Sequence, residues 1–132
     1  MNARGFVVNE LRCELEGWDD PVRGVVQWRT LLSGDRTPTE ALTMGVAEVR
    51  EHAGAHAKLH RHAQSEAYFV LSGRGVLTID GAEQALSPGD AAFIPGGAWH
   101  AARGVGDEPL RLLYVFAADS FSHVEYEFAA PE

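Results

Sequence analysis

The sequence has one cysteine, no long apolar run and few basic side chains, and each of these features excludes or disfavours a class of protein. Cys13 stands alone, so no internal disulfide can form and the fold must be held by its core. No apolar stretch approaches the roughly 20 residues of a membrane-spanning helix, and the N-terminus lacks a basic segment followed by an apolar core. We therefore expect a cytoplasmic protein with no membrane partner.

Basic side chains are outnumbered: 11 Lys and Arg stand against 19 Asp and Glu, which gives a formal net charge of −8. This balance disfavours binding to phosphate backbones, which attract clusters of positive charge, so we expect no nucleic-acid partner. The acidic side chains are typical of a solubilising surface. The 132 residues fit one domain that can bury a substantial core.

Short apolar segments separated by turn residues predict an all-β sandwich or barrel, because no segment has a convincing helical period. Asp80-Gly81 is the strongest hairpin signal, since both residues tolerate positive φ. Residues 6–15 have a loose strand-like pattern, and residues 17–21 have the composition of a turn. The other expected strands are 24–32, 43–50, 58–62, 66–71, 76–79, 83–86, 91–94, 100–103, 110–117 and 124–128.

Four potential metal ligands occur in two places along the chain. His60 and His62 are two residues apart, so both imidazoles project from one face of an extended strand, and Glu66 follows after enough chain to turn back. His100 begins a later expected strand. Imidazole together with carboxylate suits zinc, iron, manganese and nickel, so His60, His62, Glu66 and His100 are the expected ligands of one divalent transition metal per chain.

The sequence resembles the cupin superfamily over roughly residues 42–117. The first motif of that family, Gly-x5-His-x-His-x3-Glu-x6-Gly, is matched at Gly54, His60, His62, Glu66 and Gly73. The second motif, Gly-x5-Pro-x-Gly-x2-His-x3-Asn, is matched at Gly89, Pro95, Gly97 and His100. Gly104 stands where the family has asparagine, which is not a metal ligand there.

The resemblance implies a single-domain, double-stranded β-helix, the cupin or jelly-roll barrel. Residues 42–132 would form the barrel and a C-terminal edge strand. Residues 1–41 would supply N-terminal strands and an arm that packs on the barrel or on a partner subunit. The resemblance also implies a homodimer.

A site with three or four protein ligands leaves coordination positions open for a small-molecule substrate. We therefore expect an enzyme that acts on a small oxygenated metabolite, either as a dioxygenase or as a lyase or isomerase that uses metal-assisted proton abstraction. The alternative is a non-catalytic cupin that binds a small molecule or the metal.

Tyr68 is the expected catalytic residue. It lies two residues after Glu66, so both side chains share one strand face, and a phenol near a divalent ion loses its proton more easily. Such a group can act as a general base. The chain in this respect resembles small cupin lyases that cleave dimethylsulfoniopropionate to dimethyl sulfide and acrylate with a tyrosine as the base. The competing interpretation is that Tyr68 only forms the cavity wall.

Four further residues are expected to line the substrate pocket. Lys58 shares the strand parity of the two nearby histidines and could hold a substrate carboxylate, or it could be a solvated lysine near a turn. Phe93, Tyr114 and Phe116 are plausible cavity walls, although aromatic residues in a barrel are usually core.

Overall fold

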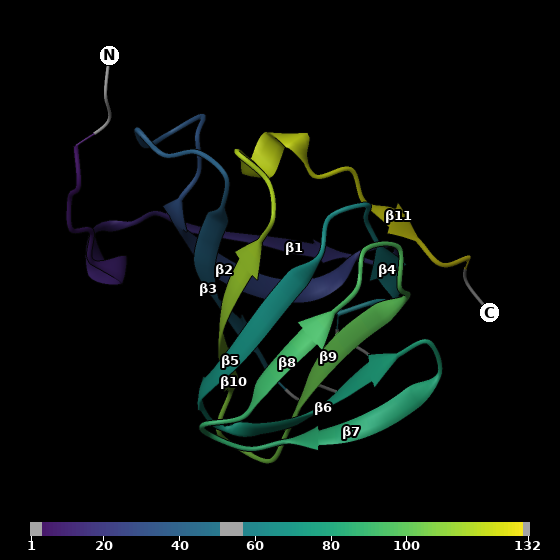
Figure 1. The fold of residues 1–132 in the computed structure, drawn as a ribbon. Helices are drawn as coiled ribbons and strands as arrows, with labels where there is room; N and C mark the ends of the chain where they lie inside the picture. Colours follow the sequence, from purple (N-terminus) through teal and green to yellow (C-terminus); the bar gives the residue numbers. More distant parts are fainter. Residues whose placement is uncertain (1–3, 51–56, 131–132) are drawn as a thin grey trace.

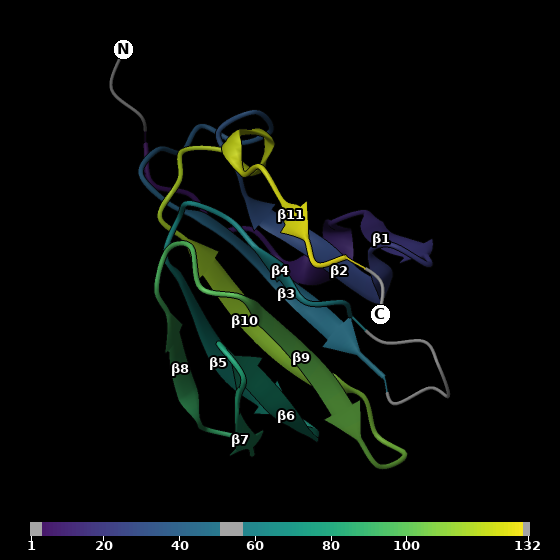
Figure 2. The same ribbon diagram turned by 90° about the vertical axis from the view of Figure 1, so that its right-hand side faces the viewer.

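The computed structural model describes residues 4–50 and 57–130, and they form two antiparallel sheets that face each other (Figures 1 and 2). One sheet has the strand order β1-β2-β3-β10-β5-β8 and the other has the order β11-β4-β9-β6-β7. The strands are β1 (Leu15–Asp20), β2 (Gly24–Leu32), β3 (Thr43–Val49), β4 (His60–Arg61), β5 (Glu66–Ser72), β6 (Arg74–Ile79), β7 (Ala82–Leu86), β8 (Ala91–Ile94), β9 (His100–Val105), β10 (Leu110–Phe116) and β11 (Glu127–Phe128). Two 3-10 turns, η1 (Glu10–Arg12) and η2 (Phe121–His123), complete the described elements. The predicted all-β, single-domain jelly-roll is confirmed.

The core lies between the two sheets because inward and outward side chains alternate along each strand. In β10, Leu110, Leu112, Tyr114 and Phe116 are buried, and the residues between them are partly exposed. β10 is paired with β3 on one side and with β5 on the other, so it is central in the six-stranded sheet. This alternation decides which side chains can reach the space between the sheets.

Glycine and aspartate make two of the turns possible. Asp80 and Gly81 have φ of 46° and 84°, which confirms the predicted hairpin between β6 and β7. Gly73 has φ of 75°, and a Cβ at this position would come within 2.1 Å of the Pro109 carbonyl oxygen. Gly54, the first glycine of the predicted motif, lies outside the described residues.

The N-terminal prediction was wrong in detail. Residues 6–15 contain the 3-10 turn η1, and the first strand is β1, which begins at Leu15 and includes most of the segment expected to be a turn. Trp18 explains the difference. Its ring packs edge-on against Trp28 at a centroid distance of 5.0 Å, and this contact stabilises the extended backbone of β1. The predicted strands at 58–62 and 124–128 are also shorter, with two residues each in β4 and β11.

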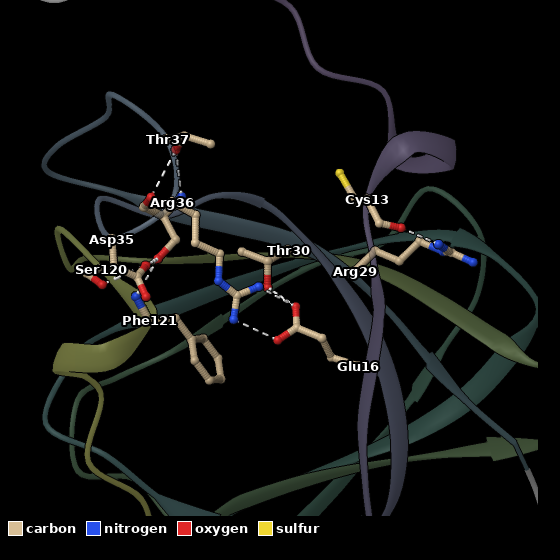
Figure 3. A network of polar contacts seen from close by, with 10 residues as sticks. Cys13, Glu16, Arg29, Thr30, Asp35, Arg36, Thr37, Ser120 and Phe121 are labelled. Carbon is tan, nitrogen blue, oxygen red and sulfur yellow. Dashed lines mark hydrogen bonds and ion pairs between the residues drawn. The ribbon is translucent and has the colours of Figure 1, made fainter.

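A polar network fixes β1 to its own barrel (Figure 3). The Glu16 carboxylate accepts hydrogen bonds from Thr30 Oγ1 at 2.8 Å and from both terminal nitrogens of Arg36 at 2.7 and 2.8 Å. The Arg36 contacts hold the pKa of Glu16 below its usual range despite partial burial. Because β2 also pairs with β3, residues 15–32 extend the barrel sheet.

Candidate metal centre

Three histidines meet between the two sheets. His60 on β4 and His100 on β9 are directly opposite each other in the strand register, and His62 follows β4. One ring nitrogen from each lies within 4.8 Å of the others, and all three side chains are buried. Residues 40 positions apart in sequence are thus brought to one point by the pairing of β4 with β9.

Each of these imidazoles is oriented by a backbone carbonyl two residues away. The Nδ1 atoms of His60, His62 and His100 lie 2.7, 2.9 and 2.9 Å from the carbonyl oxygens of Lys58, Gln64 and Ala98. A carbonyl oxygen only accepts, so each Nδ1 donates its hydrogen. In the neutral ring, this leaves the lone pair on Nε2 free to bind a metal.

The Glu66 carboxylate completes the cluster. Its Oε1 lies 3.2 Å from His100 Nε2 and 3.3 Å from His62 Nε2. These atoms are all acceptors when the rings are neutral, so they repel one another unless a proton or a cation lies among them. His62 Nε2 is also buried without a hydrogen-bond partner. The donor set therefore fits a divalent transition metal held by the three histidines, with Glu66 within reach.

The protonation states favour metal binding. Burial, together with the proximity of His100, lowers the pKa of His60 to about 4, so this ring is neutral at pH 7. Burial also acts to raise the pKa of Glu66, but its contacts with His100 and His62 outweigh burial and bring the pKa below its usual value. A neutral imidazole and an ionised carboxylate are the forms that bind metal ions.

A cavity lined mainly by aromatic and aliphatic side chains, together with Arg23, adjoins this cluster. His60, Glu66 and Tyr68 contribute to its wall, and Tyr68 is only 8% exposed. The pKa of Tyr68 is raised well above its usual value by burial and then by the Glu66 charge. The aromatic residues that line the rest of the cavity are Trp18, Trp28, Tyr114, Phe116, Phe121 and Tyr126.

The other expected pocket residues divide into two groups. Tyr114 and Phe116 line the cavity, as their inward parity on β10 requires. Phe93 does not: it is 65% exposed on the outer side of β8, because its neighbour Ile94 takes the inward position. Lys58 lines a separate surface hollow with Pro21 and Val22. It lies before β4 begins at His60, so the alternation of inward and outward side chains along a strand does not apply to it. The cavity expectation was therefore wrong for Phe93 and Lys58.

Two residues at the site were not singled out from the sequence. Tyr126 packs against His60 and His62 at centroid distances of 5.4 and 5.3 Å, and Trp18 packs against Tyr126 at 5.0 Å. The alternation in residues 124–128 could have indicated Tyr126, because it places this ring on one face with Phe128. Trp18 was not identified because residues 17–21 were expected to form a turn.

Comparisons with known proteins show which family the chain belongs to. Residues 47–116 match the cupin domain family. The chain is 40% identical over 116 residues to the dimethylsulfoniopropionate lyase DddW of Ruegeria pomeroyi, which covers 88% of this chain and 74% of that protein. It is 34% identical over 82 residues to a 5-aminosalicylate 1,2-dioxygenase of Comamonas, covering 61% of this chain and 21% of that enzyme.

A solved cupin-2 domain structure from Rhodospirillum rubrum superimposes with a TM-score of 0.74 at 24% identity, covering 98% of this chain and 84% of that one. At this identity the likeness concerns the fold alone. The described part of the chain contains no helix long and apolar enough to cross a membrane.

Proposed function

The chain belongs to the cupin family, and on that premise we propose that it is a divalent-metal-dependent lyase that acts on a small sulfonium carboxylate of the dimethylsulfoniopropionate type. The observation that carries the proposal is the buried cluster of His60, His62, Glu66 and His100 beside Tyr68. The identity to the Ruegeria lyase over most of both chains supports the same reaction class.

Tyr68 is the proposed base. As a phenolate it takes the proton from the carbon next to the substrate carboxylate, and that C–H electron pair forms a carbon–carbon double bond. The bond from the next carbon to sulfur breaks, its electron pair goes to sulfur, and dimethyl sulfide and acrylate leave. The sulfonium charge makes sulfur a good leaving group, so no oxidant is needed.

Burial alone holds the pKa of Tyr68 well above its usual range, so formation of the phenolate requires a positive charge nearby. When bound by His60, His62, Glu66 and His100, a divalent metal supplies positive charge that lowers the pKa of nearby acidic groups and attracts substrate oxygens. Tyr68 is placed to respond because it shares the inward face of β5 with Glu66.

The aromatic wall suits the sulfonium end of such a substrate. Trp28 and Tyr126 line the cavity and present ring surfaces that attract a methylated cation, whereas the Trp18 ring already has the Arg23 guanidinium 5.3 Å from its centroid. The wall also leaves few protein hydrogen bonds for a neutral polar ligand, which favours a substrate whose charge is spread over methyl groups. Exclusion of water would protect the phenolate from solvent.

Headspace gas chromatography tests the proposal directly. Protein loaded separately with Fe, Mn, Ni or Zn is incubated with dimethylsulfoniopropionate under nitrogen, and we expect dimethyl sulfide and acrylate in equal amounts with at least one metal. The proposed lyase activity is refuted if protein with about one metal per chain yields neither product with any of the four metals. Ligand binding without turnover would instead support a non-catalytic binding cupin.

A dioxygenase is the second candidate. It is favoured by the match to the Comamonas 5-aminosalicylate 1,2-dioxygenase, although the chain spans only 21% of that enzyme. Oxygen consumption measured with an electrode separates the two activities: a dioxygenase requires stoichiometric oxygen with its substrate, whereas the lyase works equally well under nitrogen.

A further inference from the structure

An arginine lies at the open end of the cavity beside the metal cluster. Arg23 lines this cavity, and 47% of its side chain is exposed, whereas His60 and Glu66 of the cluster are buried. Among the described residues that line the cavity, Arg23 and Glu66 are the two that are charged at pH 7, because the pKa of His60 is about 4. The cavity therefore has a carboxylate beside the cluster and a guanidinium at its mouth.

The turn between β1 and β2 holds this guanidinium in place. The Asp20 carboxylate accepts hydrogen bonds from the backbone N–H groups of Val22 and Arg23 at 2.9 and 2.7 Å, and from Arg23 Nε at 2.7 Å. Gly24 closes the turn with φ of 84°, a conformation that glycine adopts without strain. The guanidinium lies over the Trp18 ring, 5.3 Å from its centroid. Arg23 is thus fixed both by an ion pair and by an aromatic face.

Hydrogen bonds also connect this turn to a metal ligand. The carbonyl oxygen of Arg23 accepts a hydrogen bond from the Lys58 backbone N–H at 3.3 Å, and the Lys58 carbonyl oxygen lies 2.7 Å from His60 Nδ1. The Lys58 side chain itself lies in the separate surface hollow. Of the basic residues that the structure describes, Arg23 is therefore the one that a ligand in the cavity would meet.

We propose that Arg23 determines ligand specificity by binding a carboxylate group, so that the cavity selects small carboxylates over neutral molecules and simple cations. The bond to Asp20 uses Nε, and a guanidinium has two further nitrogens that donate hydrogen bonds to carboxylate oxygens. Like the proposed lyase, this role of Arg23 requires that the cavity binds a ligand, but it does not require turnover.

The charges of the chain support this role. A protein with a net charge of −8 repels anions, and a guanidinium at the cavity mouth offsets that repulsion where the ligand enters. The ion pair between Arg23 and Asp20 is partly exposed, with 47% and 30% of the two side chains in contact with solvent. Such pairs contribute little to folding, so stability alone does not explain why an arginine is fixed at this place.

Arg61 has the same combination of contacts away from the cavity. Its guanidinium lies over the Trp99 ring, 4.5 Å from the centroid, and its Nε lies 2.7 Å from the Glu127 carboxylate. Arg61 does not line the cavity, because it alternates with His60 and His62 and faces outward. The two arginines differ in whether they face the cavity, so Arg61→Gln is a matched control for Arg23→Gln.

Isothermal titration calorimetry on the full zinc-loaded chain tests this role with three small molecules of similar shape. 3-(Trimethylammonio)propionate carries both charges, 4,4-dimethylpentanoate has only the carboxylate, and 3-(trimethylammonio)propionamide has only the cation. We expect Arg23→Gln to raise the Kd of the two carboxylates roughly 10- to 100-fold, because charge-assisted hydrogen bonds are lost. The Kd of the amide should stay within about 3-fold of the wild-type value, because the amide does not pair with Arg23.

Two further variants complete the test. Arg61→Gln should bind all three molecules as wild type does. Arg23→Lys keeps the charge but loses the planar fork of the guanidinium, so it should weaken the two carboxylates to an intermediate extent and leave the amide unchanged. Circular dichroism and zinc content must match wild type; if Arg23→Gln does not fold, the comparison of Arg23→Lys with wild type decides.

Three results would overturn the role of Arg23. The wild type may bind neither carboxylate, the Arg23 variants may bind both carboxylates as tightly as wild type, or they may lose the amide to the same extent, as general damage to the cavity would cause. If dimethyl sulfide is still released in any of these cases, the lyase stands without this role. Binding of carboxylates that depends on Arg23 but is never followed by turnover would refute only the lyase.

Discussion

Metal binding should stabilise this protein by an amount that depends on His100. This ring is fully buried, and its Nε2 lies 3.2 Å from the Glu66 carboxylate, so the cluster is assembled only in the folded chain. A ligand that binds the folded state alone, at a free concentration 100 times its Kd, adds about 2.7 kcal/mol to the free energy of unfolding. For a domain of 132 residues this corresponds to a rise in Tm of about 10 °C.

Differential scanning fluorimetry with and without the metal measures this rise. We expect it in wild type and expect His100→Ala to lose it, with Glu66→Gln as a milder variant that keeps the side-chain volume. His123→Ala is the matched control, because His123 is exposed and stands outside the cluster. The reasoning fails if His100→Ala retains the full rise, or if His123→Ala abolishes it.

Three further results are expected. Tyr68→Phe should keep the metal but lower turnover of dimethylsulfoniopropionate by about 10²- to 10⁴-fold, the usual contribution of a general base; unchanged turnover at full metal content would end its role. Gly45→Ala should destabilise the fold by about 1–3 kcal/mol in urea unfolding, because its Cβ would lie 2.2 Å from the Tyr114 hydroxyl oxygen, while Gly5→Ala, with nothing within 4 Å, should have little effect. The free energy of unfolding of the metal-free protein should fall by about 3 kcal/mol between pH 6.5 and 4. The pKa of His60 is about 4 in the folded protein and about 6.5 in the unfolded chain, so only the unfolded state takes up this proton in that range. A free energy of unfolding that does not change with pH would contradict the burial of His60.

Side-chain parity was the part of the fold that the sequence could predict best. Strands have a period of two, so the spacing of His60 and His62 and the position of Tyr68 two residues after Glu66 each fix a common face. The same rule places Tyr114 and Phe116 inward on β10. It fails for Lys58, which lies before the two-residue strand β4 begins.

The sequence alone thus determined the all-β class and the main hairpin, because these depend on local turn chemistry and spacing, and its resemblance to two cupin motifs singled out the four candidate ligands. Only the tertiary structure decided that β4 pairs with β9 to unite His60 with His100, that Trp18 and Tyr126 close the cavity, and that Phe93 faces outward. Those results depend on the order of strands across the two sheets and on register between distant segments. Local sequence does not encode that order, because the energy that selects it comes from packing the whole core at once.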